Sequence, residues 1–294
     1  MGNFFNKKKI LNNDSINNIE LIDINDIIVK KALLIGINYT NSQNELDGCI
    51  NDCKNLYNFL TKNMYFDSKD ITIMDDFQKG KLYPTKKNIL YQFNKLANIA
   101  NSCKNKKKKV YLFVSYSGHG YYVDDEDGDE SDGKDEALCP IDAEKNGYIT
   151  DDIIKKILVD KMGENVKIVM LFDACHSGTI VDLKYNYNIQ CNRNECRMYQ
   201  SIEDSKCEVV VISGCSDSDI SADAFIYHKS IAKFEFQGAM TASFLHSFDG
   251  TKSYNNLIID MKKWLSDNEY TQQPHLSSGK FIDLDDSFLL NTFK

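Results

Sequence analysis

Two short motifs combine a histidine, a cysteine and several glycines just after apolar runs. His119 lies between two glycines in YSGHG, shortly after the run 110–114, and Cys175 lies in DACHSG, directly after 166–172. A histidine beside a cysteine can take the thiol proton, and the resulting thiolate attacks a carbonyl carbon. The joint pattern therefore predicts nucleophilic catalysis by a cysteine.

The surrounding glycines fit the same chemistry. They let the backbone approach a reacting carbonyl, and the amides of Gly120 and Cys175 are candidates for an oxyanion hole. His176 follows Cys175 directly, and neighbouring side chains on an extended segment point apart, so we interpret it as incidental. A lone cysteine or histidine at a strand end is more often a packing residue, and the prediction rests on the pair.

The elements that must position this pair follow an alternating order. Continuous apolar runs predict buried strands over 32–37, 110–114, 166–172 and 209–212, with a further candidate at 70–74. Amphipathic patterns predict helices over 46–60 and 85–103, and from Asp151 and Ser253 onward, with Thr85, Thr150 and Ser253 as N-caps. Such alternation predicts an α/β domain whose sites lie beyond the carboxyl ends of the strands.

The net charge of −8 over 294 residues is concentrated in one segment. Residues 124–136 (DDEDGDESDGKDE) hold nine acids and one lysine, so the rest of the chain balances 34 acids against 34 bases. This excludes a nucleic-acid-binding surface as a global property. The 42% of hydrophobic residues exclude a disordered chain. No apolar run reaches the roughly 20 residues of a membrane span.

The cysteines and the N-terminus favour a cytoplasmic protein. Nine cysteines at irregular spacing are typical of reduced thiols rather than of a disulfide framework. The first residues lack a secretory signal pattern. A zinc site at Cys191, Cys196, Cys207 and Cys215 is disfavoured, because neither a paired CxxC nor an HxxxH motif completes it.

The motifs and their order resemble those of the metacaspases, which are cysteine peptidases of the caspase-like fold. Further matching segments are GINYTNSQNELDGCINDC (36–53), DEALCPID (135–142), YITDDI (148–153), ISGCSDSDISADA (212–224), GAMTASF (238–244) and QQPHLSSG (272–279). The resemblance covers about residues 30–285. It implies a central, mostly parallel six-stranded sheet with helices on both faces, protein or peptide substrates, no nucleic acid or membrane partner, and a monomer.

The resemblance also assigns a substrate pocket, formed by Cys49, Asp52, Ser117 and Asp173. Two carboxylates near a nucleophile favour a basic guest, because Arg or Lys forms charge-assisted pairs with them. We therefore expect cleavage after Arg or Lys and not after Asp. The alternative is that Asp52 is a helix-surface acid and that Asp173 orients a loop.

Metacaspases are typically activated by calcium, and the resemblance matches their metal site to Asp135, Asp151, Asp152 and Asp182. Four carboxylates suit a hard cation that takes six to eight oxygen ligands. An EF-hand in the acidic run is excluded, because its glycines would require Val123 or Gly128 as the first aspartate. The remainder of that run is either a negative collar that steers basic substrates or a solvated acidic loop.

The expected organisation is an N-terminal arm (1–29), which is a candidate autoinhibitor, and one peptidase domain (30–294). Within the domain, a linker (184–206) joins a large-subunit-like part (30–183) to a small-subunit-like part (207–294). The linker's candidate self-cleavage sites are Lys184, Arg193, Arg197 and Lys206. The expected function is a calcium-dependent cysteine endopeptidase. The alternative is a catalytically silent scaffold, although scaffolds of this fold have usually lost the cysteine or the histidine.

Overall fold

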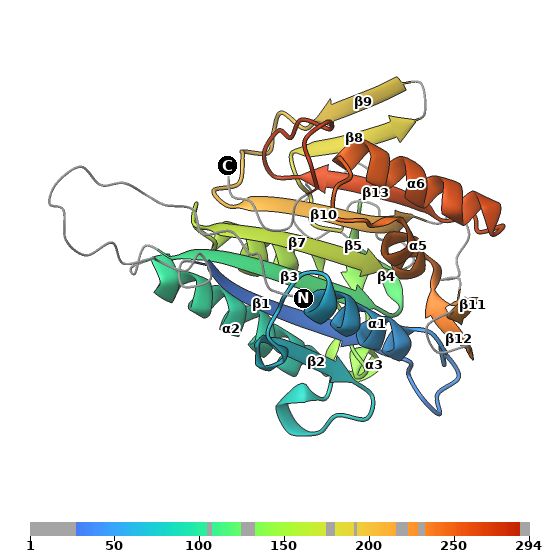
Figure 1. Ribbon diagram of the computed structural model, residues 1–294. Coiled ribbons are helices and arrows are strands. Elements are labelled where there is room, and N and C mark those ends of the chain that lie inside the picture. Colours follow the sequence, from blue (N-terminus) through green and yellow to red (C-terminus); the bar gives the residue numbers. More distant parts are fainter. Residues whose placement is uncertain are drawn as a thin grey trace, which may run out of the picture.

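The protein is built around one large twisted sheet with helices on both faces (Figure 1). The computed structural model describes residues 28–104, 108–124, 133–174, 180–190, 193–215, 223–228 and 233–288. Within these residues the central sheet has eight strands in the order β2-β1-β3-β7-β10-β13-β8-β9. Their bounds are β1 (Ile28–Gly36), β2 (Ile71–Asp75), β3 (Lys109–Ser117), β7 (Val166–Asp173), β8 (Tyr185–Gln190), β9 (Arg193–Met198), β10 (Glu208–Cys215) and β13 (Gln273–Ser278).

The five strands predicted from the sequence form the parallel part of this sheet. β2, β1, β3, β7 and β10 run parallel to one another, and β13 then pairs antiparallel with β10. Gly36, Ser117 and Asp173 are register partners across β1, β3 and β7. Three neighbouring strands therefore end at the same level, at the edge where a site was expected.

Each face of the sheet has its own hydrophobic core. The helices are α1 (Cys49–Lys62), α2 (Lys86–Lys104), α3 (Ala143–Asn146), α4 (Asp151–Lys155), which continues as a π-helical turn (Lys156–Asp160), α5 (Ala239–Ser247) and α6 (Tyr254–Asp267), with 3-10 turns at Ser68–Asp70 and Gly80–Leu82. α2 and the α4 region cover one face, through residues such as Phe93 and Leu158. α1, α5 and α6 cover the other face, through residues such as Leu56 and Phe244.

The predicted helix starts are close to the observed ones. Thr85 accepts a hydrogen bond from the Asn88 amide (3.3 Å) just before α2, and Ser253 accepts one from the Asn256 amide (3.2 Å) at α6. Both satisfy an amide of the first helical turn that has no intrahelical partner. Thr150 occupies the N-cap position of α4, but its side chain makes no capping hydrogen bond.

The segment predicted to be a linker is instead folded into the sheet. Residues 185–198 form the hairpin β8–β9, and β8 pairs antiparallel with β13. Tyr187 and Ile189 enter the core, and Asn188 between them is exposed. These two strands extend the expected six-stranded sheet to eight. The predicted boundary of the N-terminal arm also shifts, because β1 begins at Ile28; residues 1–27 lie outside the described part.

Two smaller sheets flank the central one. β4 (Gly120–Asp124), β5 (Lys134–Leu138) and β6 (Ile149–Thr150) form one of them, and β11 (Asp223–His228) and β12 (Lys233–Gly238) form the other. Asp124 pairs with Lys134, so the acidic run begins and ends on paired strands. Its central residues 125–132 lie outside the described part of the chain.

The described residues contain neither a helix that could span a membrane nor a disulfide bond. None of the helices described is both long and apolar enough to cross a bilayer. Cys49, Cys53, Cys103, Cys139, Cys196 and Cys207 are free thiols. Burial raises the pKa of Cys207 to about 12, which makes this thiol unreactive near neutral pH.

The folded hairpin predicts resistance to proteolysis after Arg197, which lies on β9. An Ile189→Asp substitution would bury a charge in the core, at a cost of about 3 kcal/mol or more, and would open the hairpin. Both proteins carry Cys175→Ala to exclude self-cleavage. We expect trypsin to cut the Ile189→Asp variant after Arg197 at least tenfold faster than it cuts the parent protein. Asn188→Asp, on the solvent side of the same strand, is the control. Equal cleavage rates in the two variants would contradict this role of the hairpin.

Candidate active site and acidic cluster

His119 lies just beyond the carboxyl end of β3, between that strand and β4. Its Nε2 lies 2.8 Å from the carbonyl oxygen of Asn44, in the loop that leads to α1. A carbonyl oxygen only accepts hydrogen bonds, so Nε2 is the donor in this contact. In the neutral ring Nδ1 is then the acceptor nitrogen. Gly120, the candidate oxyanion donor, is the first residue of β4.

Cys175 lies outside the described residues, but the strand that precedes it in the sequence is described. β7 ends at Asp173, whose register partner on β3 is Ser117. Gly118 donates its amide proton to the carbonyl oxygen of Asp173 (3.3 Å), so the two chains stay adjacent beyond the last strand pair. In the sequence, His119 comes two residues after Ser117, and Cys175 comes two residues after Asp173.

The predicted pocket residues of α1 are brought to this edge by a close approach to β1. A Cβ atom at Gly36 would lie 2.8 Å from Cys53 Sγ and would collide with the Cys49 carbonyl oxygen. Cys49 is buried, and the Asp52 side chain is completely buried. Asp52 is therefore not an acid on the surface of the helix, contrary to the alternative interpretation of this residue.

The two predicted pocket acids lie beside each other at the N-terminus of α5. Asp52 Oδ1 accepts a hydrogen bond from the Gly238 amide (3.0 Å), and Asp173 Oδ2 accepts one from the Thr241 amide (2.7 Å). A Cβ atom at Gly238 would lie 2.7 Å from Asp52 Oδ2 and would collide with Asp173 Oδ2. Ser117, the register partner of Asp173, is buried as well. The structure thus places Asp52 and Asp173 beside the first residues of α5, with Ser117 on the strand next to Asp173.

Gly238 and Thr241 received no role from the sequence, although both lie in the segment GAMTASF. The amide groups at a helix N-terminus and the helix dipole favour carboxylates. Backbone amides leave no signature in side-chain types, so this part of the site is visible only in three dimensions.

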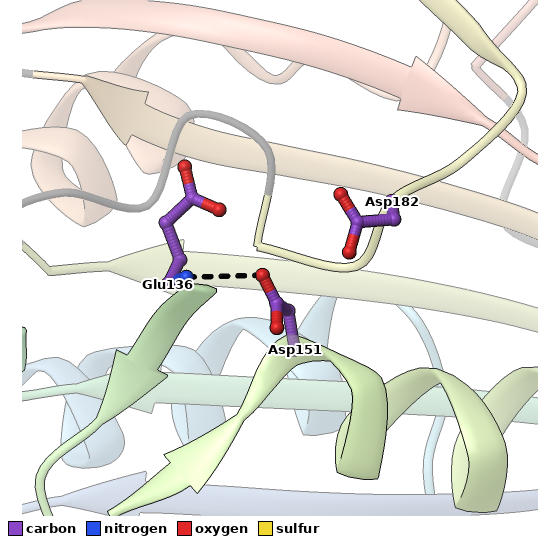
Figure 2. Close-up of side chains that lie close together, drawn as sticks. All are labelled: Glu136, Asp151 and Asp182. Carbon is purple, nitrogen blue, oxygen red and sulfur yellow. Dashed lines mark hydrogen bonds between the residues drawn. The ribbon is translucent and has the colours of Figure 1, made fainter. Parts of the chain in front are cut away.

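Three carboxylates form a second group among the described residues. Glu136 on β5, Asp151 at the start of α4 and Asp182 after β7 converge from three directions (Figure 2). One oxygen of each lies within 4.8 Å of the others. The Glu136 amide donates to Asp151 Oδ2 (3.0 Å), which joins β5 to α4.

This group shares two residues with the predicted metal set, which itself stays a prediction. Asp151 and Asp182 belong to it, whereas Asp135 and Asp152 do not, and Glu136 takes part although the sequence assigned it no role. Successive strand residues point to opposite faces, so Asp135 and Glu136 cannot point the same way. Asp152 instead contacts Asp151 through its backbone, donating its amide proton to Asp151 Oδ1 (2.9 Å).

Comparisons with known proteins agree on one family. Residues 30–184 match the family model "Metacaspase, peptidase C14 domain". Metacaspase-1 of Saccharomyces cerevisiae is 32% identical over 310 positions, covering 89% of this chain and 69% of that protein. Metacaspase-1 of Kluyveromyces lactis is 34% identical, covering 89% and 68%. The chain belongs to the metacaspase family.

The fold agrees with this membership. A crystal structure of a protein from Geobacter sulfurreducens is similar with a TM-score of 0.55 at 22% identity, covering 88% of this metacaspase and 98% of that chain. The caspase-like α/β fold expected from the sequence is confirmed, and the protein is a cysteine-type peptidase by family.

Burial dominates the electrostatics of the acidic cluster in this metacaspase. The Asp151 side chain is only 1% exposed, and its burial, together with the neighbouring Glu136 and Asp135, raises its pKa to about 9. In the unfolded chain the same carboxyl has a pKa of about 4. Without a cation, the folded protein therefore holds a proton here at neutral pH.

This raised pKa predicts how stability depends on pH. The folded state binds the proton more tightly, so the contribution of Asp151 is complete below about pH 4 and is lost as the pH rises towards 9. In the presence of a chelator, this one proton lowers the free energy of unfolding by up to about 1.4 kcal/mol for each pH unit of increase between these two pKa values.

Measuring the free energy of unfolding in urea from pH 5 to 9 tests this pH dependence. We expect a flatter profile for Asp151→Asn, whose amide oxygen can still accept from Glu136. Asp160→Asn, an exposed acid on the following π-helical turn, should keep the wild-type slope. A wild-type slope in Asp151→Asn would show that the titrating group lies elsewhere.

Proposed function

We propose that this metacaspase is a calcium-dependent cysteine endopeptidase that cleaves after Arg or Lys with a Cys175–His119 dyad. The observation that carries the proposal is the pair of buried carboxylates, Asp52 and Asp173, at the strand end that leads into Cys175. The two carboxylates give the pocket its selectivity, and the dyad supplies the chemistry.

The contacts of His119 support its role as the base. With Nε2–H donated to the Asn44 carbonyl, Nδ1 is free of that contact and takes the proton of the Cys175 thiol. The thiolate attacks the scissile carbonyl carbon, and the amides of Gly120 and Cys175 hold the resulting oxyanion. Imidazolium then returns its proton to the leaving amine. Water hydrolyses the acyl-enzyme by the same proton transfers and regenerates the thiol.

The pocket acids support the preference for a basic residue. Each carboxylate accepts one amide hydrogen bond from the N-terminal region of α5, and both residues are buried. A buried ionised group is stabilised when an opposite charge pairs with it. A guanidinium or ammonium group of the substrate would compensate both, whereas an aspartate would add a third negative charge.

Peptide cleavage tests the dyad and the pocket together. We expect hydrolysis of fluorogenic peptides that end in Arg or Lys, no hydrolysis after Asp, and complete loss with Cys175→Ala. Asp52→Asn should lower kcat/KM on the Arg peptide by roughly 30-fold or more, since one partner of a buried ion pair is lost. Asp285→Asn, an exposed acid, should behave as wild type. Preference for Asp, or full activity in Asp52→Asn, would refute the pocket.

The acidic cluster fits a hard divalent cation. Its donor atoms are carboxylate oxygens, which calcium prefers. The pKa of Asp151 is raised by burial first and by the neighbouring acids second, and a bound cation would stabilise the ionised carboxylate against both effects. Glu136, Asp151 and Asp182 would hold the ion. Glu136 and Asp182 also line a cavity of about 720 Å³, which gives an ion a path to the cluster.

The cluster is connected to the segment of the nucleophile. Asp182 has a left-handed backbone (φ 45°), which is unfavourable for a residue other than glycine. Its neighbours Ile180, Val181 and Leu183 are buried in the core. A bound cation would neutralise the three carboxylates and tie this segment to β5 and α4, which supports an effect on Cys175.

Direct calcium binding by calorimetry, together with activity, tests this site. Glu136→Gln should weaken calcium binding at least tenfold, because one charged ligand is lost, and should raise the calcium concentration needed for activity by the same factor. Asp160→Asn, which changes an acid lining the same cavity, is the matched control. Full activity in chelator would contradict the calcium requirement. An unchanged calcium affinity in Glu136→Gln would show that Glu136 is not a ligand and would favour the set that includes Asp135 and Asp152.

A further inference from the structure

Two tyrosine hydroxyl groups hold the backbone of His119 from both sides. The His119 amide donates to Tyr39 Oη (3.0 Å), and Tyr116 Oη donates to the His119 carbonyl oxygen (2.9 Å). The two hydroxyl oxygens lie 3.0 Å apart. Both polar backbone groups of the predicted base are therefore fixed by side chains.

The hydroxyl protons can be assigned consistently. Tyr39 Oη lies 2.6 Å from the carbonyl oxygen of Cys139 and donates there, while it accepts from His119. Tyr116 Oη lies 2.9 Å from the His119 carbonyl oxygen and 3.0 Å from that of Cys139, and with Tyr39 donating to Cys139 its proton goes to His119. The Cys139 amide donates to both the His119 carbonyl oxygen (3.1 Å) and Tyr116 Oη (3.2 Å). Each hydroxyl thus donates once and accepts at least once. Burial raises the pKa of both phenols well above the usual value, so both keep their protons.

Gly118 is what allows the hydroxyls to come so close to the chain. A Cβ atom at this position would lie 2.8 Å from Tyr116 Oη and 3.0 Å from Tyr39 Oη. Contacts this short force a neighbour to move. The glycine before the histidine in YSGHG is thus explained by the hydroxyl pair.

Tyr39 also contacts the imidazole ring itself. The centroids of the Tyr39 and His119 rings lie 4.7 Å apart with an interplanar angle of 37°. The same loop supplies the Asn44 carbonyl that accepts from Nε2. One loop therefore fixes the backbone of His119, packs against its ring and selects its tautomer.

The conformation of Tyr39 is itself imposed by a neighbouring carboxylate. Tyr39 has a left-handed backbone (φ 52°), which an aromatic residue rarely adopts. Asp76 accepts hydrogen bonds from the amides on both sides of it, those of Asn38 (2.9 Å) and Thr40 (2.8 Å). A strained residue persists when its surroundings over-determine it, and such strain is concentrated at functional sites.

We propose that Tyr39 and Tyr116 are positioning residues that hold His119 as the base, and that Asp76 holds Tyr39 in place. This inference rests on the proposed role of His119. The hydroxyl pair keeps the imidazole at one depth, where the Asn44 carbonyl selects its tautomer, so that Nδ1 meets the thiol in each turnover. Neither tyrosine contacts the substrate in this proposal, and the preference for a basic residue does not depend on them.

The test compares Tyr39→Phe, Tyr116→Phe and Asp76→Asn with Tyr91→Phe, an exposed tyrosine on α2. For the first three variants we expect kcat on an Arg peptide to fall about 10- to 100-fold with KM within twofold, as for a lost transition-state interaction. The pH profile of Cys175 alkylation by iodoacetamide should shift in the same variants, because it reports the thiolate–imidazolium pair. Tyr91→Phe should match wild type in both measurements.

Two results would overturn the inference. One is wild-type kcat and alkylation profile in Tyr39→Phe and Tyr116→Phe. The other is a loss of active protein, by active-site titration, whose remaining molecules have normal kcat and a normal profile, because this describes a purely structural role. If Tyr39→Phe and Tyr116→Phe fold poorly alone, 15N shifts of the His119 ring are compared in Cys175→Ala protein with and without the conservative Asp76→Asn substitution: a single Nε2–H tautomer is expected with Asp76 and a mixture with Asp76→Asn, and identical spectra contradict the proposal.

His119→Ala separates this inference from the proposed function. Activity in His119→Ala would refute the dyad itself. Loss of activity there, combined with unaffected tyrosine variants, would refute only the positioning role.

Discussion

The parallel pairing of β3 with β7 is the constraint on which the rest of the site depends. It makes Ser117 and Asp173 register partners, so the two motif-bearing segments leave the sheet side by side. A slip of one residue would reverse the direction of each side chain on β7 and remove Asp173 from the amides of α5. The fully buried faces of both strands, with residues such as Val114 and Phe172, oppose such a slip. Packing of the core therefore sets the geometry of the chemistry.

The second constraint is charge, because the site places acids where water is excluded. Asp52 and Asp173 are stabilised by amides near the N-terminus of α5, and Gly238 leaves room for both carboxylates. Asp151 is buried against other acids and keeps a proton instead. Helix ends and protons are two ways to lower the cost of a buried carboxylate. In both cases a cation can also stabilise the carboxylates, the substrate's basic group in the first centre and a metal ion in the second, on the proposed function.

The sequence predicted β1, β3, β7 and β10 well because each contains a continuous apolar run that is buried on both sides. β2, a half-buried edge strand, was the weaker candidate. It missed β8, where the apolar alternation of Tyr185, Tyr187 and Ile189 is interrupted by asparagines that lower its β-propensity. It missed β13, in which Leu276 is the one aliphatic core residue and Pro274 argues against an interior strand. The pocket acids were found through the family's motifs. Glu136 and the hydroxyl pair were not, because such contacts join segments far apart in the chain.

The segment of Cys175 is flanked in the sequence by residues of two acidic centres, which on the proposed function take different cations. Asp173 precedes it and Asp182 follows it, nine residues apart in the chain. On the proposed reading, the first centre is neutralised by the substrate's basic side chain and the second by a metal ion. Each cation would stabilise carboxylates next to one end of this segment. On this proposal the substrate's basic side chain and the metal ion act on the two flanks of one short segment, which makes the two acidic centres a joint control on it.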